Sequence, residues 1–224
     1  MFYKYKKMKG KIHKSAVLVS AILVLITSIL GGCSSRGGWT ASELETISST
    51  IPGTDSLGTS ILRVLTIADK ADSVVLRTPC ADFTPSMMQS PEFASLASLM
   101  LATVQDPSED GVGIAGPQVG ISRRIVAVQR FDKPGEPFEV YPNIRIVATH
   151  GDLCPGPEGC LSVPGLRGDV MRWRDIDITY SLGPRDTTER VQGFTAVIFQ
   201  HECDHLDGVL YIDKVVPGTL RERD

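Results

Sequence analysis

The chain has 224 residues, of which 42% are hydrophobic and 22% are charged, and its formal net charge is −3. These values suit one globular domain with an appendage. They lack the cationic excess that is typical of nucleic-acid-binding proteins, so we expect no nucleic-acid partner. We also expect a monomer.

The first 33 residues have the pattern of a lipoprotein-type signal peptide. Six lysines precede a fifteen-residue apolar run, Ala16–Leu30, which is short for a transmembrane helix. The run ends in Leu-Gly-Gly followed by Cys33, which resembles a bacterial lipobox. We expect cleavage before Cys33 and lipid on its thiol. The protein would then be anchored in a membrane and face the extracytoplasmic side; an uncleaved N-terminal anchor is the alternative.

The remaining chain divides by composition into a linker, a domain and a tail. Residues 34–60 are rich in Ser, Thr and Gly, which predicts a flexible tether with at most one short helix near Ala41–Ser48. A folded domain is expected over residues 61–216, followed by a charged C-terminal tail, 217–224.

The first half of the domain contains one predicted helix and several strands. The helix covers residues 85–104, where apolar side chains recur at helical spacing and an Asp-Pro pair follows. A glycine-containing loop is expected at Gly111–Gln118, and the apolar run Ile125–Val128 predicts a buried strand. A turn at Phe131–Pro137 leads to another strand, Phe138–Ala148.

The second half predicts antiparallel strands followed by a helix. Leu166–Val170 and Ile176–Tyr180 alternate apolar and polar residues, as strands do. The helix covers Gly193–Leu206, and one of its faces carries Phe194, Val197, Ile198, His201 and His205. We therefore predict an α+β fold in which antiparallel β-sheets surround this central helix.

The central helix carries an HExxH motif. Its two histidines, His201 and His205, are one turn apart and can bind one metal ion, while Glu202 is placed to act as a general base. The spacing is typical of metallohydrolases. A helix with two partly exposed histidines is the alternative, but the apolar neighbours on the same face indicate that both histidines point inward.

A third protein ligand has to come from upstream. A metzincin would place a histidine where Tyr211 stands, and Glu222 lies in the charged tail. His150 and Cys160 both have suitable chemistry, and Cys160 lies between Pro- and Gly-rich segments that predict a turn. Cys203 is two residues from His201 and points about 200° away, so we expect it to be a packed thiol.

Three motifs follow one another along the chain. They are Gly111-Val112-Gly113-Ile114-Ala115-Gly116-Pro117-Gln118, Glu158-Gly159-Cys160-Leu161-Ser162 and Gln200-His201-Glu202-Cys203-Asp204-His205. With these motifs in this order, the chain resembles the peptide deformylase family over Ile61–Val216. The resemblance implies the peptide deformylase fold and a hydrolase that removes the formyl group from N-formylmethionyl peptides and releases formate. Such enzymes usually work in the cytoplasm, so a cytoplasmic location is the alternative to the anchor.

The resemblance also implies a role for each site residue. Cys160, His201 and His205 would hold one divalent ion, Fe(II) in the family, with Zn(II) or Ni(II) also possible. Glu202 would be the base, and the Gln118 amide with the Leu161 backbone N–H would bind the oxyanion. The expected substrate contacts are Val112, Phe194, Val197 and Ile198 in an apolar pocket, Gly113 and Gly159 beside the peptide backbone, and Arg167. Glu158 with Arg172, and Gln200 with Asp204, would orient the ligands.

Two other functions fit the same residues. One is a related metallo-amidase or peptidase with another acyl substrate, and the other is a non-catalytic binding lipoprotein. A non-catalytic binding protein would tend to lose its base or one of its metal ligands. This chain has all of the expected catalytic and ligating residues, Gln118, Cys160, His201, Glu202 and His205, which argues against the second function. The pairing of Cys80 with Cys154 in a disulfide is left open.

Overall fold

The computed structural model describes residues 38–54, 58–109, 111–182 and 185–223, all within one compact unit, Cys33–Asp224. The signal peptide expected at residues 1–33 lies outside the described residues. Within the described residues, no helix combines the length and the apolar character needed to cross a membrane.

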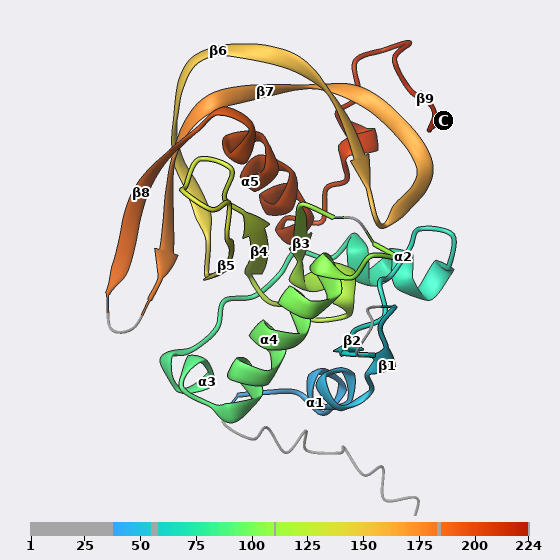
Figure 1. The fold of residues 1–224 in the computed structure, drawn as a ribbon, viewed down its shortest axis with the longest axis vertical. Helices are drawn as coiled ribbons and strands as arrows, with labels where there is room; N and C mark the ends of the chain where they lie inside the picture. Colours follow the sequence, from blue (N-terminus) through green and yellow to red (C-terminus); the bar gives the residue numbers. More distant parts are fainter. Residues whose placement is uncertain (1–37, 55–57, 110, 183–184, 224) are drawn as a thin grey trace, which may run out of the picture. The chain divides into compact units, whose positions relative to one another are not determined.

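Antiparallel sheets and five α-helices make up the described part of the chain (Figure 1). The helices are α1 (Ala41–Ser48), α2 (Lys70–Leu76), α3 (Pro85–Met88), α4 (Pro91–Gln105) and α5 (Gly193–Leu206), with short 3₁₀ helices η1 (Gly116–Val119) and η2 (Tyr211–Asp213). The strands are β1 (Ile51–Pro52), β2 (Ser60–Ile61), β3 (Gly113–Ala115), β4 (Ile125–Gln129), β5 (Phe138–Pro142), β6 (Arg145–Cys160), β7 (Val163–Ser181), β8 (Asp186–Gln192) and β9 (Arg221–Glu222).

The three-stranded sheet β3-β4-β5 separates two apolar cores. Successive side chains of β4 point to opposite faces, so Val126 and Val128 pack on the α5 side. Ile125 and Ala127 pack on the other side, with α4. Both faces are therefore covered, which explains why the predicted strand reads as an uninterrupted apolar run.

Helix α5 lies inside the curve of the long strands β6 and β7 (Figure 1). Its bounds, Gly193–Leu206, are those predicted, because the apolar face and the HExxH motif share one helical period. Gln192 ends β8, and Gly193 has a φ of 70°, a left-handed conformation that glycine adopts without steric cost. The chain can thus turn directly from the sheet into the helix.

Two elements expected in the first half of the domain are each interrupted in the structure. The helix predicted over 85–104 is two helices, because Ser90 caps the Phe93 N–H at 3.3 Å and Pro91 starts α4. The strand predicted over 138–148 is broken at Asn143, whose φ is 54°.

The turn expected around Cys160 is narrower than predicted. Strand β6 continues through Pro155, Gly156 and Pro157 to Cys160, and its register with β7 pairs Glu158 with Gly168. The two strands expected at 166–170 and 176–180 are parts of the single strand β7. Pro and Gly are tolerated here because the long ribbon contains register shifts, one of them between Gly159 and Cys160.

The segment before residue 61 packs on the domain in its described part, so the expected flexible tether is wrong there. Helix α1 has the predicted bounds, but Trp39 is fully buried and donates from Nε1 to Ser90 Oγ at 3.0 Å. Glu43 accepts from Arg123 Nε at 2.6 Å, and β1 pairs with β2. A single large aromatic side chain and one ion pair thus fix a segment whose average composition predicts a linker.

The C-terminal tail is also ordered by the domain. Strand β9 pairs with β7, Leu166 opposite Glu222 and Arg167 opposite Arg221. The Arg223 backbone N–H donates to Gly165 O at 2.9 Å. Strand β9 therefore extends the sheet formed by β6, β7 and β8, and Arg223 is bonded to the same sheet.

Candidate active site

The structure brings Cys160 to the two histidines of α5. Cys160 is the last residue of β6, and its Sγ lies 3.1 Å from His205 Nε2. One ligand atom from each of Cys160, His201 and His205 falls within 4.8 Å of the others. His150 points elsewhere, with Nε2 2.9 Å from Asp177 Oδ2. Of the two upstream candidates, geometry therefore selects Cys160.

A chain of buried ion pairs orients His201. Its Nδ1 lies 2.9 Å from Glu158 Oε2, which leaves Nε2 for a ligand. Arg172 donates to Glu158 from Nε at 2.7 Å and from Nη2 at 3.0 Å, and to Asp204 from Nη1 at 2.6 Å. The expected Glu158–Arg172 pair is present, and it ties the cysteine strand to the histidine helix.

Gln200 and Cys203 lie on the faces of α5 that turn away from the cluster. The Gln200 amide accepts from Trp173 N at 3.1 Å and donates to Trp173 O at 2.7 Å, which ties α5 to β7. Cys203 packs in an apolar core, and burial raises the pKa of its thiol to about 12. All four described cysteines are free thiols, including Cys80 and Cys154.

The cluster favours the metal-binding form of its thiol. Burial by itself raises the pKa of Cys160, but the adjacent His205 and His201 imidazoles outweigh it and hold this pKa well below the ordinary value. A thiolate with two imidazoles is a donor set that binds divalent transition metals. The chemistry of the donors and their spacing therefore fit one metal ion.

Glu202 lies beside the cluster in a desolvated position. It is 3% exposed, and its Oε2 atom has no hydrogen-bond partner among the residues that the structure describes. Burial raises the pKa of Glu202 to about 7. Gly113 creates the space for this carboxylate, since a Cβ there would lie 2.5 Å from Glu202 Oε1 and 2.8 Å from Ile198 Cγ2. A glycine expected to face substrate thus also accommodates the base.

Gln118 presents its amide nitrogen to the cluster. Its Oε1 accepts from Ala115 N at 2.8 Å, which fixes the orientation of the amide. Its Nε2 lies 3.2 Å from Ser162 Oγ and 3.5 Å from Cys160 Sγ. Nearby, Gly116 is fixed by close backbone approach, because a Cβ there would lie 2.6 Å from Arg123 O.

A pocket of about 280 Å³ opens beside the cluster. It is lined by every residue predicted to contact substrate, namely Val112, Gly113, Gly159, Arg167, Phe194, Val197 and Ile198, and by Gln118, Leu161 and Glu202. Phe194 is 48% exposed, and its ring centroid lies 5.4 Å from that of Phe131.

The sequence analysis missed three residues that line this pocket, Gly111, Pro157 and Arg223. Gly111 stands in a motif that was recognised, but Pro157 and Arg223 belong to segments expected to be a turn and a tail. Only the pairing of β6, β7 and β9 brings these two residues to the site.

A Cys/His/His cluster on an HExxH helix, with a buried carboxylate and an apolar pocket, defines a metal-dependent hydrolase. Comparison with known families agrees: the model of the polypeptide deformylase family matches residues 61–220. The chain belongs to this family, whose members use a divalent metal to remove the formyl group from N-formylmethionyl peptides.

Known peptide deformylases resemble the chain in sequence and in fold. The Leptospira biflexa enzyme is 37% identical over 166 residues, which is 67% of this chain and 88% of that protein. The Thermotoga maritima structure has 30% identity and a TM-score of 0.61, and covers 70% of this chain and 99% of its own. The Met-Ala-Ser-bound structure from Acinetobacter baumannii has 34% identity and a TM-score of 0.61, with coverages of 69% and 98%.

Proposed function

We propose that the chain deformylates N-formylmethionyl peptides at the Cys160/His201/His205 cluster, with Glu202 as general base and general acid. The observation that carries this assignment is the buried carboxylate of Glu202, whose Oε2 has no hydrogen-bond partner in the described part of the chain, beside three convergent metal-ligating side chains. A divalent ion held there supplies Lewis-acid activation of a water molecule.

The residues around the cluster have separate tasks in this reaction. Glu202 accepts the proton of the attacking water and delivers it to the leaving amine, which requires a pKa near neutrality. The Gln118 amide, fixed by Ala115, donates to the oxyanion, and the Leu161 backbone N–H is the second donor. The protein therefore supplies both a base for the attacking water and hydrogen-bond donors for the oxyanion.

The pocket selects the substrate. Val112, Val197, Ile198 and Phe194 form an apolar wall suited to a methionine side chain. Gly113 is at the end of β3 and Gly159 near the end of β6, so a peptide between them can pair with strand backbone. The Met-Ala-Ser peptide bound to the A. baumannii relative has the same chemical form as a deformylated product.

We assign Fe(II) as the ion by analogy with the family, with Zn(II) or Ni(II) as substitutes, because thiolate and imidazole ligands suit all three. We further propose that the protein is a monomer anchored through lipid on Cys33 at the extracytoplasmic face of a membrane. The order of basic region, apolar run and Leu-Gly-Gly-Cys supports the anchor.

Formate release and metal content together test the proposal. The purified chain should contain one transition-metal ion and release formate from formyl-Met-Ala-Ser. It should release little acetate from acetyl-Met-Ala-Ser. Equal rates on both peptides would favour the runner-up, an amidase with broader acyl specificity, and metal binding without release of either acid would favour a binding lipoprotein.

A further inference from the structure

The C-terminal strand delivers an arginine to the rim of the active-site pocket. Strand β9 lies along β7, and the Arg223 N–H is bonded to Gly165 O at 2.9 Å. The segment before β9 is also fixed, by Val216 N to Asp169 O at 2.8 Å and Asp169 N to Thr219 Oγ1 at 2.9 Å. The position of Arg223 is thus set by backbone pairing.

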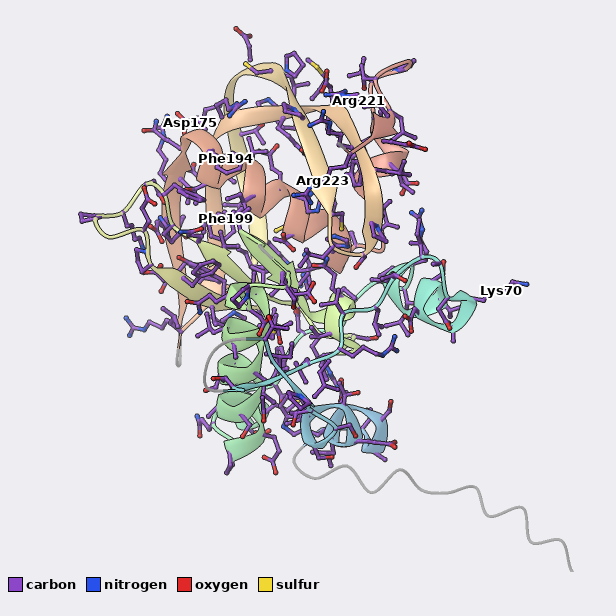
Figure 2. All side chains as sticks on the ribbon, turned by 45° about the vertical axis from the view of Figure 1, so that its right-hand side comes forward. Lys70, Asp175, Phe194, Phe199, Arg221 and Arg223 are labelled. Carbon is purple, nitrogen blue, oxygen red and sulfur yellow. The ribbon has the colours of Figure 1, made fainter. Side chains whose placement is uncertain are left out.

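Arg223 lines the pocket, together with Pro157, Gly159 and Arg167. Figure 2 shows it between the C-terminal strand and α5, apart from Arg221. Arg221 has other contacts: it donates to Thr219 O at 2.8 Å and lies 3.7 Å from Asp169 Oδ1. Of these two neighbouring arginines, only Arg223 is a pocket residue.

The charges at the pocket are unevenly distributed. The two lining carboxylates are buried at its inner end, where Glu158 is bonded to Arg172 and His201 and Glu202 faces the cluster. Arg223 is exposed at the outer end, where a peptide lying along Gly159 would leave the pocket. Positive charge at that point favours a negatively charged group on the downstream part of the peptide.

Resting on the proposed deformylase function, we propose that Arg223 binds a carboxylate of the substrate, downstream of the formylated methionine. The carboxylate comes from an acidic side chain or from the free C-terminus of a short peptide. Because β9 fixes the backbone of Arg223, less conformational freedom is lost on binding than for an arginine in an unpaired tail. This residue would make the enzyme selective among formylated peptides.

Four peptides separate the two sources of the carboxylate. Formyl-Met-Ala-Ser as free acid or as amide tests the C-terminus, and formyl-Met-Ala-Glu-amide or formyl-Met-Ala-Gln-amide tests the side chain. With the whole chain purified in detergent and loaded with metal, we expect kcat/KM to favour the carboxylate member of at least one pair about threefold to fivefold, the upper part of the range for an exposed ion pair. The preference should reside in KM and fall with added salt.

Matched variants on the same strand test the residue. Arg223→Gln should bring the ratio within the favoured pair close to one, whereas Arg221→Gln, which removes the same charge two positions away, should leave it unchanged. The Kd of the product of the favoured pair, Met-Ala-Ser as free acid or Met-Ala-Glu-amide, should rise only in Arg223→Gln. A wild-type protein without any preference, or a preference that survives in Arg223→Gln, would overturn the inference. Absence of formate from all four peptides would instead overturn the proposed function.

Discussion

Glu202 combines burial, an unpartnered oxygen and proximity to the metal-ligating cluster. These three properties suit a group that exchanges a proton with a reacting water, and Gly113 leaves the space that the carboxylate occupies. Since Glu202 is not one of the three clustered ligands, its removal separates catalysis from metal binding.

We expect Glu202→Ala to keep the metal and to lose at least about a hundredfold in kcat, the lower end of the range for general acid–base catalysis. Formate release and metal content should be measured on the same preparation. Unchanged kcat in a metal-loaded variant would show that another group moves the proton.

Cys160 and Cys203 differ in what their thiols contact, which makes them a matched pair. Cys160 Sγ lies 3.1 Å from His205 Nε2, whereas Cys203 packs among apolar side chains of the core. We expect Cys160→Ala to abolish tight metal binding. Cys203→Ala should retain the metal, and so should His150→Ala, since His150 contacts Asp177. Loss of metal in His150→Ala together with retention in Cys160→Ala would refute the assigned ligand.

The sequence was most informative where a residue's role follows from local spacing. The histidines and Glu202 share one helical turn, so their juxtaposition is fixed by the period of α5. Cys160 comes from β6, which is distant in sequence from α5. Residue spacing alone therefore did not decide between Cys160 and His150 as the third metal ligand. The place of Arg223 at the pocket depends on the pairing of β9 with β7. No local pattern in the charged tail indicates that pairing.

At the level of elements, helix α5 and strand β4 were predictable because each has a clear apolar pattern. The separation of α3 from α4 depends on the cap at Ser90, and the long ribbon β6–β7 passes through prolines and glycines that usually mark turns. Pairing with the neighbouring strand keeps these prolines and glycines in an extended strand, so the local sequence alone does not predict the strand.

Helix α1 is an element whose order depends on tertiary contacts. The Thr40 side chain and the Glu43 carboxylate form a capping box, and Glu43 also pairs with Arg123 at 2.6 Å. Burial acts to raise the pKa of Glu43, but the hydrogen bonds from Arg123 and Thr40 outweigh it and lower this pKa below 4.5. Stabilisation by Glu43 is therefore complete above pH 4.5 and is lost as the pH falls through the lowered pKa.

We expect Glu43→Gln to destabilise the domain by about 1–2 kcal/mol at pH 7, from the lost charged hydrogen bonds and cap. The difference from the wild type should shrink as the pH falls through the lowered pKa of Glu43, since a protonated Glu43 is similar to glutamine. The difference in stability can be measured by thermal unfolding followed by Trp39 fluorescence, in a background in which Trp173 is replaced by Phe. Glu45→Gln, on the exposed side of the same helix, is the control and should change little. Equal stability of the two variants would mean that the ion pair does not hold α1.

For the whole molecule, the docked Trp39 limits how far the domain can lie from an anchor at Cys33. The two residues are six positions apart, at most about 20 Å of extended chain. A lipidated Cys33 would therefore hold the catalytic domain close to the membrane surface. In an oxidising compartment, a ferrous ion beside the Cys160 thiolate is prone to oxidation, which favours Zn(II) in its place.

The anchor predicts that the intact protein fractionates with membranes and partitions into detergent. Labelled palmitate in the native host should enter the wild type but not Cys33→Ala, because the thiol is the acceptor. A chain beginning at Arg36 keeps Trp39 and should be soluble and active, whereas one beginning at Ala41 loses that core contact and should be less stable. If neither wild type nor Cys33→Ala takes up label and the protein is found in the cytosol, the anchor is wrong, and the N-terminal residues serve the fold through Trp39 and α1 without a role in location.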